Sequence, residues 1–273
     1  MRPGWLNARA ANTLQENESA SLPHVSRRFR SLILAYHAVS DAWVHQLAMP
    51  TLLMERQLRS LLYRGFRPAS AGDTLSGARR LLHVTFDDAY KSVAGALPIL
   101  ERLGLRATVF ACAGYADDGR PLDVPELAEE AAAHPEHLAT MTWDELRDLA
   151  ERGVEIGSHT VSHPHLPELS DAELDRELRE SRGRCEEELG RPCRFLAYPY
   201  GEHDARVQTA VRRAGYAAAF SLRGRTSPTN LYALPRVDLY PRDTLWRATL
   251  KTSFVRQPAT AVSDLVRRSR RPT

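Results

Sequence analysis

The chain of 273 residues is 43% hydrophobic and 26% charged, which indicates a globular protein with a substantial core. Its net charge of +3 is too small to indicate a nucleic acid as partner, although basic runs stand at residues 27–30 and 267–271. No apolar run approaches the roughly 18–20 residues that a transmembrane helix needs. Residues 1–25 lack the apolar core of a signal peptide, so we expect a cytoplasmic protein.

The polarity of the chain divides it into three parts. Residues 1–30 are polar and without clear period, which predicts a flexible arm. Residues 31–260 hold the predicted folded domain, and residues 261–273 form a basic tail. Three cysteines without a CxxC pair do not suggest a disulfide framework, so we expect reduced thiols.

Short apolar runs predict buried parallel strands, which read as continuous rather than alternating patterns. In chain order they are residues 32–37, 81–88, 106–114, 154–159, 194–201, 216–222 and 234–240. Helical stretches separate most of these runs. The sequence therefore predicts an α/β fold with a parallel sheet of about seven strands, closed as an irregular barrel; an open doubly wound sheet is the alternative.

The helical stretches carry start and stop signals. Thr142 with Glu145, and Ser170 with Glu173, form capping boxes at the start of two of them. Asp204 is a candidate N-cap of a third. In the stretch 92–104, Pro98 should kink the helix or begin a new helical turn.

Several predicted strands end in chemically capable residues. The first ends in His37, the second in Asp87 and Asp88, the fourth in His159, and the fifth in a Pro-Tyr-Gly turn at residues 199–201. In parallel α/β folds, functional side chains gather at the carboxyl ends of strands. We therefore expect these residues to share one rim.

The paired aspartates can serve one site only if the strand ends between them, because neighbouring strand residues point to opposite faces. One could then bind a cation while the other acts as a base; a helix cap plus a solvated acid is the alternative. His159 and His163 have a spacing that could direct both at one metal ion, although such pairs also occur as surface residues. His165 follows Pro164, which should turn the chain away from the site, so we expect His165 to be a bystander rather than a ligand.

Two further histidines have separate expectations. His37 could donate a proton to a leaving group, because imidazole titrates in the right range; a structural role is the alternative. His83 stands inside an apolar run, which predicts a core position. The other histidines carry no usable pattern.

Three motifs in this order resemble those of the polysaccharide deacetylase family, the NodB-homology domain of carbohydrate esterase family 4. They are TFDDAY at 85–90, SHTVSH at 158–163 and FLAYPYG at 195–201, within a resemblance that covers roughly residues 31–240. The resemblance implies an irregular (β/α) barrel that usually has seven strands. It implies a metal-dependent amide hydrolase that acts on a carbohydrate.

The resemblance also implies the role of each site residue. Asp87 would be the general base, and one divalent ion, with zinc expected, would bind Asp88, His159 and His163. The backbone N–H of Tyr200 would help to hold the oxyanion, in a loop shaped by Pro199 and Gly201.

The sequence departs from the best-known members at three points. Ala197 stands where those members have an arginine that braces the catalytic aspartate, and Arg236 could supply this charge from the next rim position. No histidine follows His203, so the catalytic histidine would be His37, as in the branch with poly-N-acetylglucosamine deacetylases. Ala89 replaces the usual glycine of the aspartate motif.

The leading hypothesis is an N-deacetylase of an amino-sugar glycan or glycoconjugate. The second is a deacetylase or deformylase of a small glycolipid or biosynthetic glycoside, which a cytoplasmic location would favour. The third is a catalytically inactive sugar-binding relative, which the arginine missing at residue 197 would favour.

Overall fold

The structure is a computed structural model that describes residues 31–76, 78, 80–222 and 230–253. The predicted arm at residues 1–30 and the basic tail at 261–273 lie outside the described residues. No helix within the described ranges is long and apolar enough to span a membrane.

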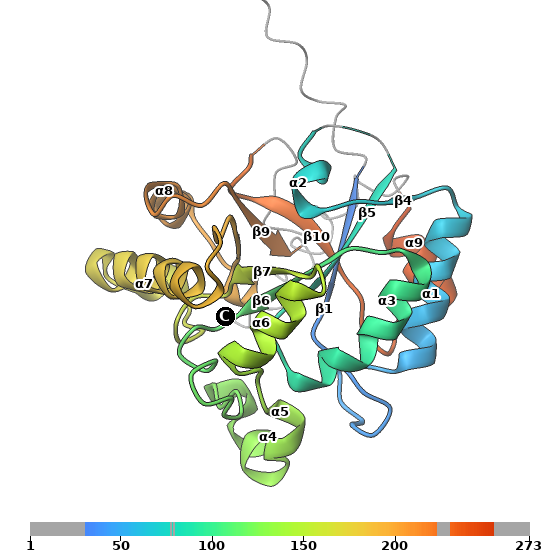
Figure 1. The fold of residues 1–273 in the computed structure, drawn as a ribbon, viewed down its shortest axis with the longest axis horizontal. Coiled ribbons are helices and arrows are strands. Elements are labelled where there is room, and N and C mark those ends of the chain that lie inside the picture. Colours follow the sequence, from blue (N-terminus) through green and yellow to red (C-terminus); the bar gives the residue numbers. More distant parts are fainter. Residues whose placement is uncertain (1–30, 77, 79, 223–229, 254–273) are drawn as a thin grey trace, which may run out of the picture.

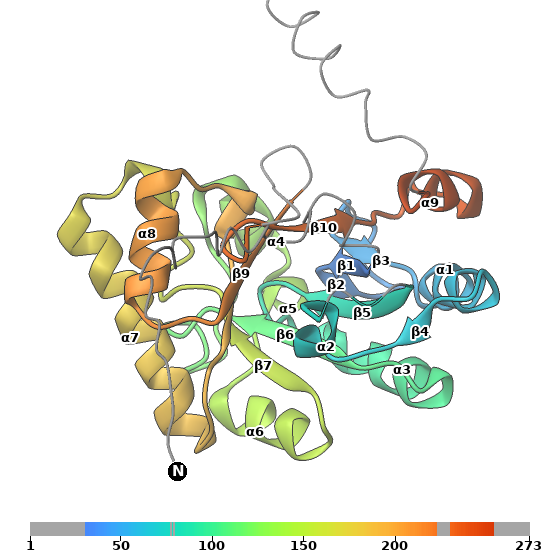
Figure 2. The ribbon, with the colours of Figure 1, turned by 90° about the horizontal axis from the view of Figure 1, so that it is seen from above.

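The centre of the molecule is a closed parallel barrel (Figure 1, Figure 2). The strands lie in the order β1-β10-β9-β8-β7-β6-β5, and the ring closes because β1 also pairs with β5 in parallel. Short β4 extends the sheet beside β5, and β2 pairs with β3 outside the barrel. The strand bounds are β1 (Leu32–Tyr36), β2 (Ala38–Val39), β3 (Ala48–Met49), β4 (Arg67–Pro68), β5 (Leu81–Phe86), β6 (Ala107–Ala111), β7 (Glu155–Ser158), β8 (Phe195–Ala197), β9 (Ala218–Leu222) and β10 (Leu234–Asp238). The prediction of a seven-stranded parallel barrel is confirmed, and the open sheet is not found.

Helices surround the barrel, as the two views show. Their bounds are α1 (Thr51–Tyr63), α2 (Ala71–Thr74), α3 (Leu97–Leu103), α4 (Ala128–Ala133), α5 (Pro135–Leu138), α6 (Trp143–Glu151), α7 (Asp171–Leu189), α8 (Ala205–Arg213) and α9 (Leu245–Lys251). Both predicted capping boxes form, at Thr142 before α6 and Ser170 before α7, and Asp204 caps α8. Pro98 stands in the first turn of α3, directly after a 3₁₀ turn, so it begins a helical turn as predicted.

The barrel interior is filled by side chains from several strands. Ile33, Phe110, Phe195, Phe220 and Leu234 belong to one buried cluster, together with small residues. Gly157 on β7 makes room for this packing, because an added Cβ would lie 2.5 Å from the Phe110 ring. Alternation along β5 continues the same inward face through residues 83, 85 and 87. The barrel therefore directs Asp87 inward at its carboxyl end.

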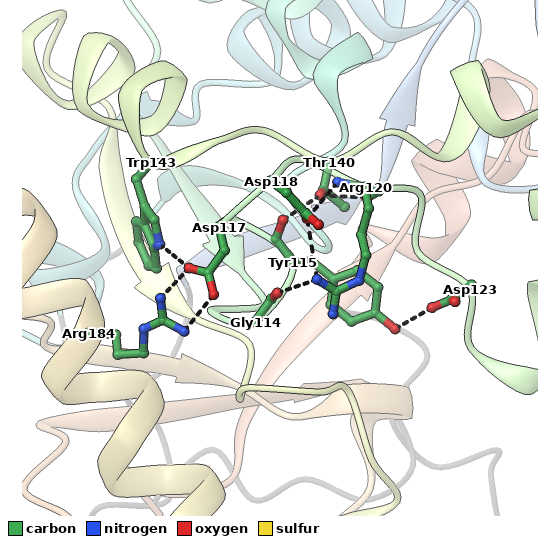
Figure 3. A network of polar contacts seen from close by, with 9 residues as sticks. All are labelled: Gly114, Tyr115, Asp117, Asp118, Arg120, Asp123, Thr140, Trp143 and Arg184. Atoms are coloured by element: carbon green, nitrogen blue, oxygen red, sulfur yellow. Dashed lines mark hydrogen bonds and ion pairs between the residues drawn. The ribbon is translucent and has the colours of Figure 1, made fainter.

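The segment between β6 and α6, residues 112–142, carries α4 and α5 and lies at the opposite end of the barrel from α2 (Figure 1). Asp117 fixes its base, because its carboxylate accepts hydrogen bonds from Trp143 Nε1 at 2.9 Å and from Arg184 (Figure 3). Arg120 lies over the Tyr115 ring and donates to the Gly114 carbonyl. We call residues 112–142 the β6–α6 segment.

Candidate metal centre and catalytic site

The two aspartates lie where β5 ends. β5 stops at Phe86, and the Asp87 backbone N–H donates to the carbonyl of Tyr36 on neighbouring β1 at 3.0 Å. Asp88 and Ala89 then take positive φ angles of 67° and 51°. This turn allows both carboxylates to reach one site. It also gives a reason for the glycine usual at position 89, because only glycine adopts such angles without a steric penalty.

Asp88, His159 and His163 come together in a buried group at the rim. Nε2 of His159 and Nε2 of His163 each lie 3.4 Å from Oδ1 of Asp88. His159 donates its Nδ1–H to the Ala197 carbonyl at 2.8 Å, which leaves Nε2 free to ligate. His163 has a positive φ of 59°, and its backbone N–H donates to the Thr160 hydroxyl.

The three side chains fit a divalent metal ion. Asp88 Oδ1 is buried and has no hydrogen-bond partner among the described residues, although two imidazole nitrogens face it. Ligand atoms of a tetrahedral zinc ion lie about 3.4 Å apart when each bond is about 2.1 Å. Burial acts to raise the pKa of Asp88, but His159 and His163 hold it well below its usual value. The carboxylate is therefore ionised, as a metal ligand must be.

Asp87 is paired with Arg236. The buried guanidinium of Arg236 donates to both Asp87 carboxylate oxygens, at 2.6 and 2.8 Å, and to the Thr85 hydroxyl at 3.0 Å. Burial acts to raise the pKa of Asp87, but Arg236 and His159 lower it below its usual value. Arg236 thus reaches the aspartate that the sequence predicted it to brace, from β10 rather than from position 197 on β8.

His37 directly follows β1 at the same rim and is partly exposed. Its ring is nearly parallel to that of Tyr240, with the centroids 6.5 Å apart. Its charge helps to lower the pKa of both Asp87 and Asp88, after the larger effects of their direct partners. A partly exposed imidazole therefore stands beside the two carboxylates.

The Pro-Tyr-Gly turn lies against the candidate metal ligands. Tyr200 has a positive φ of 57°, and its ring contacts His163 edge-on at 4.6 Å. His165 stacks on the same ring at 4.0 Å, so it lies beside the site but outside the group of three. There is no room for a side chain at Gly201, since an added Cβ would lie 2.9 Å from Leu222.

Polar contacts hold Tyr200 and His165 in place. The Tyr200 hydroxyl donates to Glu126 of the β6–α6 segment at 2.9 Å. His165 is hydrogen-bonded with Glu202 at 2.9 Å and with Glu126 at 3.3 Å. His165 lies outside the group of three, as expected of a bystander, but Pro164 does not turn it away from the rim, because its ring stacks on Tyr200.

Sequence reasoning missed Glu177, which shapes the histidine loop. The carboxylate of this buried α7 residue accepts hydrogen bonds from the backbone N–H groups of Val161 and Ser162, at 2.8 and 3.1 Å, and from the Ser162 hydroxyl at 2.8 Å. The available signal was its spacing: Leu174, Glu177, Leu178 and Ser181 share the buried face of the helix. An acid on an apolar face needs a partner, and here the partner is the loop between the two metal-ligand candidates.

Known proteins share both the sequence pattern and the fold. The family profile described as polysaccharide deacetylase matches residues 75–219. YxkH of Bacillus subtilis (strain 168), which carries the name of a polysaccharide deacetylase, is 22% identical over 237 residues, or 83% of this chain and 77% of that protein.

Two solved structures have a similar fold. The Streptococcus pyogenes deacetylase PplD, solved in complex with acetate, has a TM-score of 0.67 and 21% identity, covering 83% of this chain and 99% of that one. A de-N-acetylase from Aggregatibacter actinomycetemcomitans has a TM-score of 0.63 and 19% identity, covering 81% and 99%.

The family profile spans more than half of the chain and includes both aspartates, both ligand histidines and the Pro-Tyr-Gly turn. His37 and Arg236 lie outside the matched range, and only the fold brings them to the same rim. The chain belongs to the polysaccharide deacetylase family.

Proposed function

We propose that this protein is a metal-dependent hydrolase that removes N-acetyl groups from amino-sugar residues of a glycan or glycoconjugate. The observation that carries the proposal is the buried group of Asp88, His159 and His163 directly beside the Asp87–Arg236 pair. A ligand set and a separate carboxylate base are what a metal-assisted amide hydrolysis needs. Membership of a deacetylase family supports the hydrolase activity.

We propose zinc as the ion. Two imidazole nitrogens and one carboxylate oxygen suit it, and three protein ligands leave a position open for catalysis. A bound divalent ion supplies Lewis acidity, which acidifies water and polarises a carbonyl group.

Asp87 is the proposed general base. Its lowered pKa keeps the carboxylate ionised and able to accept a proton from the attacking water. Arg236 fixes both carboxylate oxygens, so the orientation of the base is set before substrate binds. This pair performs the bracing role that the sequence suggested for it.

His37 and the Tyr200 turn complete the proposed mechanism. His37 is the proposed proton donor to the departing sugar amine, because it stands at the rim beside both carboxylates and is partly exposed. The backbone N–H of Tyr200 is the proposed donor to the oxyanion of the tetrahedral intermediate. Its turn is held by contacts with His163, His165 and Glu126.

The proposal that an N-acetyl group is the one removed rests on two structural relatives. One structural relative is named as a de-N-acetylase, and another was solved with acetate, the expected product. The intact base beside an intact ligand set argues against an inactive sugar-binding relative, since binding alone needs no base.

Acetate release tests the proposal. The zinc-loaded protein is incubated with chitin oligomers, poly-N-acetylglucosamine fragments and small acetylated glycosides, with and without a chelator. We expect acetate from at least one amino sugar, loss with the chelator, and recovery with added zinc. Sugar binding without acetate release from any of them would contradict the proposal. Release from the small glycosides alone would favour the glycolipid or biosynthetic alternative.

A further inference from the structure

A second group of metal-ligating side chains lies in the β6–α6 segment, apart from the catalytic group. His134, Glu136 and His137 each offer one ligand atom, and these atoms all lie within 4.8 Å of one another. Glu136 Oε1 lies 3.7 Å from His134 Nδ1 and 3.8 Å from His137 Nε2. The two Glu136 distances exceed by only a few tenths of an ångström the separation of about 3.4 Å between tetrahedral zinc ligands.

The donor set favours a borderline transition metal. Two imidazoles and one carboxylate suit zinc, whereas calcium and magnesium prefer oxygen ligands alone. Glu136 and His134 are largely exposed, and His137 is partly buried, so water can complete the coordination. The chemistry therefore points to an open surface site that exchanges its ion with solvent.

The backbone that carries the group is well supported. His134 ends α4 and begins α5, and its N–H donates to the Glu130 carbonyl at 2.8 Å. Pro135 occupies the first turn of α5, where its fixed φ favours a helix. The three candidate ligands therefore occupy one ordered turn rather than a free loop.

The ring of His137 is held by a buried tryptophan. Trp43 stacks on His137 with centroids 5.5 Å apart and planes 14° from parallel. The Trp43 indole donates to Glu130 at 2.6 Å, and His45 stacks on it at 4.6 Å. A pre-set ring loses less conformational entropy when it binds an ion.

The charge of the segment also attracts a cation. Residues 115–138 contain seven Asp and Glu residues but one Arg and no Lys, although the whole chain has a net charge of +3. This local excess of negative charge raises the concentration of divalent cations near the group.

We propose that His134, Glu136 and His137 form a second, peripheral binding site for a zinc-type divalent ion, weaker than the catalytic site and independent of it. A bound ion would tie the end of α4 to the start of α5 and stabilise the β6–α6 segment. This second site is separate from the candidate catalytic site, because the two groups of side chains share no residue.

Zinc titration with a competing chromophoric chelator tests the proposal. We expect the metal-free protein to bind two equivalents of zinc. The double variant His134→Gln/His137→Gln should bind one and release acetate at the unchanged rate. The matched control is His45→Gln, which alters the same aromatic stack but no proposed ligand and should keep two equivalents. Glu136→Gln should weaken the second equivalent at least about tenfold.

The variant Asp88→Ala isolates the second site. In this background zinc should raise the melting temperature, and adding His134→Gln/His137→Gln should abolish the rise. One equivalent of zinc in the unaltered protein would overturn the proposal, as would a second equivalent that survives the double histidine change. Because the stoichiometry is read without substrate, these outcomes leave the deacetylase proposal to its own test.

Discussion

Two histidines at opposite ends of the barrel, one within a strand and one directly after another strand, have opposite environments. His83, near the start of β5, uses both ring nitrogens: Nδ1 donates to the Ala69 carbonyl at 2.9 Å, and Nε2 is hydrogen-bonded with the Thr108 hydroxyl at 2.8 Å. His159, directly after β7, uses only Nδ1 in this way, and its Nε2 faces Asp88. Both side chains are buried.

The difference shows what separates a structural histidine from a ligand candidate. Burial alone does not distinguish them, but the number of satisfied ring nitrogens does. His83 is neutral, and both of its ring nitrogens are hydrogen-bonded, so this side chain contributes to the stability of the fold. His159 is anchored at one nitrogen and presents the other to a carboxylate oxygen that has no hydrogen-bond partner among the described residues, which fits the proposed metal site.

Among rim variants that leave both aspartates and the two candidate ligand histidines unchanged, the largest effect is expected from His37→Ala. If His37 protonates the leaving amine, kcat should fall by about 10²–10⁴-fold. Zinc content and melting temperature should stay unchanged, because the side chain is partly exposed and is not a ligand. Steady-state kinetics and metal analysis of the same sample check this. A kcat within about threefold of the native value would remove His37 from the mechanism.

Arg236→Met tests the buried pair at the same end. Removing the guanidinium leaves the Asp87 carboxylate buried without its bidentate partner, which should cost about 3–5 kcal/mol of unfolding free energy. It should also raise the pKa of Asp87. Because the base must be ionised, the acidic limb of the kcat/KM profile should move to higher pH. An unmoved limb in a folded variant would show that Arg236 does not set this ionisation.

His83→Gln tests the end of the barrel opposite the candidate site, where the stability of the fold rather than the activity should change. Burial lowers the pKa of His83 to about 4, so between pH 6.5 and 4 the unfolded chain binds more protons than the folded one. The stabilisation is full above pH 6.5 and is lost as the pH falls, by about 3 kcal/mol in all.

Urea unfolding of the native protein and of the His83→Gln variant at pH 7 and pH 4.5 measures this loss. The difference in unfolding free energy between the two proteins should shrink at the lower pH. Acetate release at pH 7 should stay within about twofold of the native rate. A constant difference in unfolding free energy would contradict a neutral His83.

The smallest change in free energy is expected from His165→Ala, at the outer edge of the rim. Loss of the stacking on Tyr200 should loosen the proposed oxyanion turn and lower kcat by about 3–10-fold, with zinc content unchanged. Tyr200→Phe is the matched variant, because it keeps the ring and removes only the hydrogen bond to Glu126. Loss of zinc from the His165 variant would make His165 a ligand instead.

Local sequence signals predicted the parts of the fold that local chemistry determines. All seven barrel strands and the caps at Thr142, Ser170 and Asp204 are found where apolar runs and capping residues indicated. Helices α1, α2, α4, α5 and α9 were not predicted, and α1 and α9 form one packed pair. Their packing against each other joins residues about 190 positions apart, as in the Arg64–Thr252 hydrogen bond.

The candidate site was predictable as far as strand ends reveal it. The pairing of Arg236 with Asp87 depends on β1 lying between β10 and β5, which no single run of sequence specifies. Glu177 and Glu126 reach the site from a helix face and from the β6–α6 segment, through contacts that only the folded chain creates. Side chains supplied by the strands were therefore found, and those supplied from outside the barrel were missed.

The central claim is that Asp87 and Asp88, adjacent in sequence, have separate tasks. The most direct test measures zinc content and acetate release in parallel for Asp87→Asn and Asp88→Ala. We predict that Asp87→Asn keeps its catalytic zinc and loses acetate release, whereas Asp88→Ala loses both. Full activity in Asp87→Asn, or retained catalytic zinc in Asp88→Ala, would contradict this division of roles.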